Sequence, residues 1–70
     1  MDMESIGKRI KEIRVERGLS QQKFGELLSV SQDTISLWEK GKSLPTTECL
    51  ITIATKFEIS VDYILCLIDY

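Results

Sequence analysis

Residues 30–45, "VSQDTISLWEKGKSLP", join a short helical pattern to a basic loop. Ser31 is a preferred N-cap residue, and the apolar residues after it recur at helical spacing as far as Trp38. Pro45 bars a helix from continuing, so the stretch predicts a helix over about 31–40 that ends in a loop. Small polar side chains at the helix start and lysines beyond its end suit a binding surface, but an ordinary surface helix can begin in the same way. The remainder of the sequence decides between these interpretations.

Four further helices can be placed on either side of this one. Ile6, Ile10 and Ile13 recur at i, i+4 and i+7, which predicts an amphipathic first helix that Gly18 ends. Good N-cap residues precede the other three, namely Ser20, Thr46 or Thr47, and Ser60. The expected fold is an all-α, compact five-helix bundle in one domain over residues 1–70, with helices at about 4–17, 20–28, 31–40, 46–57 and 60–68.

The helical period also predicts which apolar side chains point inward. The expected core residues are Ile6, Ile10, Ile13, Phe24, Leu27, Leu28, Ile35, Trp38, Leu50, Ile53, Ala54, Phe57, Ile64 and Leu65.

Composition limits the classes of protein that this chain can belong to. Seventy residues with 43% hydrophobic content support one modest core, and 29% charged residues are typical of a folded domain. Two cysteines, Cys49 and Cys66, form no disulfide framework, and without histidine there is no zinc-finger spacing. No secretory signal or membrane-length apolar run is present, so we expect a cytoplasmic protein with reduced thiols and no membrane partner.

Charge is distributed unevenly along the chain. The net charge is −2, which by itself disfavours nucleic acid as a partner. Residues 6–43, however, hold eight basic and five acidic residues, a net charge of +3. The remainder holds one basic and six acidic residues, a net charge of −5. This asymmetry indicates a partner that binds one side of the molecule, although chance among few charges is the alternative.

Three segments, "RGLSQ", "TISLWEKGKSLP" and "ISVDYIL", stand in an order and at a spacing that carry a family resemblance. The very short turn "LLSVS" between the second and third predicted helices has the dimension of a helix-turn-helix. From about Ile6 to Leu65 the chain resembles the Xre/Cro type of lambda-repressor-like helix-turn-helix regulators. The resemblance implies a lambda-repressor-like DNA-binding domain whose third helix lies in the DNA major groove.

Two positions depart from the family pattern. Gly25 stands where the family usually has alanine, and we expect a small residue there because the third helix crosses closely; glycine costs about 1 kcal/mol of helix propensity. Ser29 stands where the family often has glycine in the turn. A left-handed backbone at Ser29 would cost roughly 1–3 kcal/mol.

The resemblance implies that four outward side chains near the start of the third helix contact base edges, with Ser31 at the cap. These residues are Gln32, Asp33, Thr34 and Leu37. Gln32 can bond adenine bidentately, Thr34 can bond a base or touch a thymine methyl, and Leu37 can touch a thymine methyl. Asp33 can accept from cytosine or can instead cap the helix. The alternative is that all four are ordinary exposed helix residues.

Phosphate contacts are expected from helix N-termini and from the loop after the third helix. The candidates are Ser20, Gln21, Ser31, Lys40, Lys42 and Ser43. For the two loop lysines, a role in solubility is the alternative. The resemblance also implies an ion pair between Arg14 and Glu39 that fixes the third helix against the first.

The C-terminal stretch "SVDYILCLIDY" has more apolar surface than one face of a short helix can bury. We expect this surplus to form a homodimer interface, made by Tyr63, Cys66, Leu67, Ile68 and Tyr70. The alternative is that the segment folds back over the core of its own chain.

The sequence thus predicts a sequence-specific, double-stranded DNA-binding transcriptional regulator, a homodimeric repressor of a palindromic operator. The alternative is an antitoxin-like or protein-interaction subunit that binds a partner through its C-terminal helix. An enzyme is not expected, because there is no histidine, no glycine-rich phosphate loop and no nucleophile paired with a base. No cofactor, metal or small-molecule ligand is expected.

Overall fold

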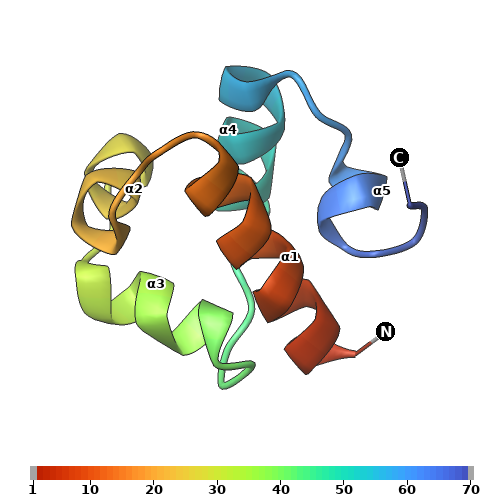
Figure 1. The fold of residues 1–70 in the computed structure, drawn as a ribbon, viewed down its shortest axis with the longest axis horizontal. Coiled ribbons are helices and arrows are strands. Elements are labelled where there is room, and N and C mark those ends of the chain that lie inside the picture. Colours follow the sequence, from red (N-terminus) through yellow and green to blue (C-terminus); the bar gives the residue numbers. More distant parts are fainter. Residues whose placement is uncertain (1, 70) are drawn as a thin grey trace.

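The structure is a computed structural model that describes residues 2–69, and that part of the chain contains helices and no strand. The helices are α1 (Met3–Glu16), α2 (Gln21–Leu28), α3 (Gln32–Glu39), α4 (Thr47–Phe57) and α5 (Val61–Ile64) (Figure 1). The all-α prediction with five helices is confirmed. No helix within residues 2–69 is long and apolar enough to cross a membrane.

Short polar side chains begin every helix. The side chains of Ser20, Ser31, Thr46 and Ser60 each accept a hydrogen bond from the backbone N–H three residues later, as the sequence pattern predicted. Asp2 caps α1 by accepting from the N–H of Glu4, two residues later, at 3.1 Å. These caps fix where each helix begins, and connections of a few residues then force neighbouring helices together.

Helix α1 lies at the centre of the arrangement, with α2 and α3 on one side and α5 on the other (Figure 1). Gly7 lets α1 approach the end of α3: a Cβ there would overlap the carbonyl oxygen of Trp38 and lie 2.9 Å from that of Glu39. Trp38 is only 3% exposed, which confirms its predicted core position.

Apolar side chains from all five helices pack together in one core. The fully buried ones are Phe24, Ile6, Ile10, Ile13, Ile35, Ile53 and Ile64. The ring of Phe24 stacks on that of Phe57 with centroids 5.9 Å apart. Leu27, predicted to be inward, is 39% exposed, because Phe24 and Leu28 already form the buried face of the short helix α2.

Helix α5 is shorter than the predicted 60–68 and ends at Ile64. Cys66 adopts a left-handed backbone with φ 62°, and its N–H bonds the carbonyl of Tyr63 while the N–H of Leu67 bonds that of Asp62. This pair of hydrogen bonds is a Schellman motif, which ends a helix. The sequence pattern missed it because cysteine does not usually occupy the left-handed position.

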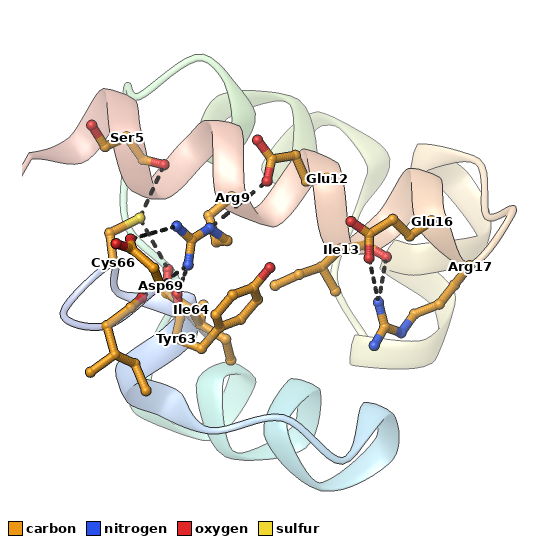
Figure 2. A network of polar contacts seen from close by, with 11 residues as sticks. Ser5, Arg9, Glu12, Ile13, Glu16, Arg17, Tyr63, Ile64, Cys66 and Asp69 are labelled. Atoms are coloured by element: carbon orange, nitrogen blue, oxygen red, sulfur yellow. Dashed lines mark hydrogen bonds and ion pairs between the residues drawn. The ribbon is translucent and has the colours of Figure 1, made fainter.

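The segment after α5 folds back onto α1 (Figure 2). Arg9 of α1 donates from Nη1 to the carbonyl oxygens of Tyr63 at 2.7 Å and of Ile68 at 3.3 Å. Its guanidinium also lies 4.1 Å from the centroid of the Tyr63 ring. The thiol of Cys66 donates to the carbonyl of Ser5 at 3.4 Å. Folding back onto the same chain is the alternative that the sequence left open beside the expected homodimer interface.

Candidate nucleic-acid interface

The turn between α2 and α3 sets the angle at which the two helices meet. Ser29 is left-handed with φ 60°, so serine does accept the conformation that glycine would adopt freely. The N–H of Val30 bonds the carbonyl of Gly25 at 2.9 Å. A Cβ on Gly25 would lie 2.7 Å from the carbonyl oxygen of Val30. The small residue is therefore needed because the turn backbone comes close, rather than because of the α3 side chains.

A polar network joins α1, α2 and α3. Arg14 donates from Nε and Nη2 to the two carboxylate oxygens of Glu39, at 2.7 and 3.0 Å. Its Nη1 donates to the carbonyl oxygen of Leu19 at 2.8 Å. The side chains of Arg14 and Glu39 are 11% and 5% exposed. The expected ion pair is therefore present, and the hydrogen bond to Glu39 raises the pKa of Arg14.

Gln21, at the start of α2, extends this network to the start of α3. Its Nε2 donates to Glu39 Oε1 at 3.1 Å, and its Oε1 accepts from Gln32 Nε2 at 3.5 Å. The network thus runs from Arg14 through Glu39 and Gln21 to Gln32. From the sequence, Gln21 is expected only to contact phosphate. Its position between Glu39 and Gln32 depends on how α2 and α3 cross, which the sequence does not show.

The four side chains predicted to contact bases differ in their surroundings. Gln32 and Asp33 are exposed at the first turn of α3, and Leu37 is 45% exposed one turn further on. Thr34 is half-buried, and its hydroxyl lies 3.0 Å from that of Ser31. Thr34 therefore shares the helix cap, whereas the other three point into solvent.

The basic loop after α3 lies against the start of α1. Gly41 has φ 74°, and a Cβ there would lie 3.1 Å from the Cα of Glu4. Lys40 and Lys42 are exposed on either side of Gly41, and Ser43 is half-buried. The glycine thus brings the loop backbone close to α1 while the two lysine side chains face solvent.

The start of α2 exposes Ser20, and Gln21 beside it is half-buried. Ser20 accepts from the N–H of Lys23, while the first N–H groups of any helix have no partner within that helix. Lys23 itself lies 3.7 Å from the carboxylate of Glu26. The N-terminal turns of α2 and α3, together with the loop after α3, therefore present N–H groups and cations.

The residues predicted to form a dimer interface differ in how exposed they are. Tyr63, Cys66 and Ile68 are half-buried in contacts with α1, and Leu67 is 61% exposed. Tyr70 lies outside the described residues. Arg9, which bonds this segment, was not predicted from the sequence to have a structural role. The one sequence feature that could have indicated this role is its position at the edge of the apolar stripe, between Ile6 and Ile13.

Comparisons with known proteins agree with this architecture. Residues 10–64 match the family model described as helix-turn-helix. The HTH-type transcriptional regulator ImmR of Bacillus subtilis (strain 168) is 33% identical over 61 residues, covering 87% of this chain and 48% of that protein. The antitoxin PezA of Streptococcus pneumoniae serotype 4 is 36% identical over 55 residues, covering 79% of this chain and 35% of that protein. The chain therefore spans less than half the length of these relatives.

A solved structure leads to the same family. The crystal structure of the P22 c2 repressor protein in complex with a synthetic operator superposes with a TM-score of 0.78 at 30% identity, covering 84% of this chain and 89% of that one. ImmR and the P22 protein are a transcription regulator and a repressor, which agrees with the expectation that this chain is no enzyme. The family model, the relatives and the fold together show that the chain belongs to the Xre/Cro-type, lambda-repressor-like helix-turn-helix family of DNA-binding transcription regulators.

Proposed function

We propose that this chain is a sequence-specific repressor that binds double-stranded DNA with α3 in the major groove. The observation that carries the proposal is the network from Arg14 through Glu39 and Gln21 to Gln32, because it fixes the exposed start of α3. A DNA-reading helix must be held rigidly for its side chains to meet base edges in a defined register. The P22 relative was solved with a synthetic operator, which supports the same class of ligand.

Gln32 is the leading base contact in this proposal. Its amide nitrogen donates to Gln21, and that side chain bond orients the amide while the residue stays exposed. A bidentate contact from glutamine to adenine gives about 1–3 kcal/mol of discrimination against other bases. Asp33 and Leu37 flank it as candidates for cytosine and for a thymine methyl. Thr34 contributes through its methyl group, since its hydroxyl lies beside that of Ser31.

Phosphate contacts in this proposal come from two places. The first is the paired N-terminal turns of α2 and α3, with Ser20, Gln21 and Ser31. The second is the loop with Lys40, Lys42 and Ser43. Ammonium groups placed there add sequence-independent affinity that weakens as salt rises.

We further propose that the regulator acts as a homodimer on a palindromic operator. A twofold axis near α5 would place two copies of α3 about one turn of DNA apart. Leu67 is the most exposed apolar side chain on this side of the molecule, so it is the leading interface residue. Sedimentation of the purified chain with and without an operator duplex tests the dimer, and Leu67→Ser should weaken it.

Selection from random duplexes at two salt concentrations tests the DNA-binding proposal. We expect an enriched palindrome whose affinity falls as salt rises. Gln32→Ala should then relax the preference at one base pair of each half-site, whereas Lys42→Ala should weaken all sequences alike and lower the salt slope by about 1. Only weak, unselective binding would contradict the proposal and favour the second candidate, a protein-interaction subunit.

A further inference from the structure

A groove of about 570 Å³ lies on the side of the molecule away from the candidate DNA interface. It is lined by the last turn of α1, the α4–α5 connection, α5 and the segment after it, and no residue of α2 or α3 contributes. Its apolar part consists of Ile59, Tyr63 and Ile68, all half-buried. The volume is within the range of sites that hold a few side chains of a ligand.

The rim of this groove is acidic. Glu16, Glu58 and Asp69 supply three carboxylates against the single guanidinium of Arg17 among the lining residues. Figure 2 shows Glu16 and Asp69 with their arginine partners. Glu16 lies 3.8 Å from Arg17, and Asp69 lies 3.9 Å from Arg9. These ion pairs are long, and the two carboxylate side chains are 65% and 100% exposed, so both are accessible to an incoming cation.

The two arginines near the groove are committed to the protein itself. Arg17 donates to the carbonyl of Ile13 at 3.0 Å, and its guanidinium lies 4.9 Å from the centroid of the Phe57 ring. Arg9 donates to the carbonyls of Tyr63 and Ile68. Neither guanidinium is therefore free to turn towards an anion in the groove.

Charge complementarity selects one kind of occupant. A phosphate of DNA or of an anionic lipid would meet the rim carboxylates and be repelled. A second copy placed by a twofold axis through the groove would set the same three carboxylates opposite themselves. The homodimer proposed above therefore requires an axis beside the groove, at Leu67, which does not line it. We propose that the groove binds a short segment of another protein in which lysine or arginine side chains flank bulky apolar ones. This inference does not depend on DNA binding.

Titration of the full chain with a capped peptide of alternating lysine and leucine tests the inference. We expect amide chemical-shift changes at residues 16–17, 58–60 and 63, and none in α3. Matched peptides with glutamate in place of lysine, or with serine in place of leucine, should not bind. Equal binding of either matched peptide, shifts located in α2 and α3, or no binding of the lysine–leucine peptide would overturn the inference.

Matched variants separate the groove from overall charge. The double variant Glu58→Gln with Asp69→Asn should weaken the peptide about threefold to tenfold, because each exposed pair contributes little alone. Glu26→Gln with Glu48→Gln makes the same change of net charge outside the groove and should leave the affinity unchanged. Equal weakening by both pairs would contradict the inference. Shifts at residues 16–17 and 58–60 that appear on concentrating the protein without peptide would assign the groove to a second copy instead, whereas shifts confined to the residues beside Leu67 would report only the proposed homodimer.

Discussion

Arg14 and Arg9 hold two different parts of the chain to the same helix, and they do so through different chemistry. Arg14 bonds the carboxylate of Glu39 at 2.7 and 3.0 Å and fixes α3. Arg9 bonds backbone carbonyls of Tyr63 and Ile68 and fixes the segment after α5. The first partner is a charged side chain that is 5% exposed, and the second partners are neutral carbonyl groups of half-buried residues.

This difference indicates how each region responds when its contact is lost. Removing Arg14 leaves a buried carboxylate without its cation, so the cost falls on the whole fold. Removing Arg9 leaves only neutral carbonyl oxygens without a partner, so the cost is smaller and falls on the segment after α5. The orientation of α3 is therefore held firmly against α1, whereas the segment after α5 can shift at lower cost.

The largest expected effect tests this distinction directly. Arg14→Met keeps much of the apolar stem but leaves Glu39 unpaired, and it should lower the free energy of unfolding by about 3 kcal/mol. DNA affinity should fall as well, measured under conditions where the variant is folded, because Gln21 and Gln32 lose their fixed orientation. Urea unfolding and binding to the selected operator measure the two effects.

A matched surface pair provides the control. Lys23 and Glu26 lie 3.7 Å apart with side chains 66% and 57% exposed. Glu26→Gln should change stability by less than about 0.5 kcal/mol. Equal effects of Arg14→Met and Glu26→Gln would show that the buried ion pair between α1 and α3 contributes no more to stability than an exposed one.

Gly7→Ala tests the same side of α1 without changing any charge. A Cβ there would overlap the carbonyl of Trp38, so α3 must shift, at about 1–3 kcal/mol. Chemical shifts should change along α3 and remain constant in α5. Gly18→Ala is the control, because no atom lies within 4 Å of its added Cβ and only the φ of 68° resists the change.

The sequence predicted the contacts that local patterns or family motifs carry. Cap residues such as Ser31 act within three residues, and Arg14 with Glu39 belongs to a recognised motif. The contacts of Arg9 join residues 54 and 59 positions apart in the sequence, and a place at the edge of the apolar stripe does not identify partners that far away. The length of α5 was missed for a different reason, because Cys66 holds the left-handed position of a local Schellman turn, which cysteine rarely adopts.

Arg9→Met should have a smaller and more local effect than Arg14→Met. The variant loses two hydrogen bonds to carbonyl oxygens and the contact with the Tyr63 ring, about 1–2 kcal/mol in total. Amide hydrogen exchange should accelerate at residues 65–69 and remain unchanged in α2 and α3. Faster exchange throughout the chain would show that the segment after α5 is part of the global folding unit.

The smallest expected effect concerns the cap of α1, which lies beside the same C-terminal segment. The hydroxyl of Ser5 and the N–H of Glu4 bond the carboxylate of Asp2 and lower its pKa below the usual 3.8. A lowered pKa in the folded state means that the charged cap stabilises the fold above about pH 4 and that this stabilisation is lost as pH falls further.

Asp2→Asn removes that acid dependence while it keeps a capping side chain. Its melting temperature should lie slightly below that of the unmodified chain at neutral pH, and the two should converge as pH falls towards 3. Because the carbonyl of Ser5 also accepts a hydrogen bond from the Cys66 thiol, the protection factor of the Cys66 amide, which is corrected for the intrinsic pH dependence of exchange, should follow the same pH course. A protection factor at Cys66 that does not change with pH would separate the cap from the C-terminal segment and leave Arg9 as the contact that holds it.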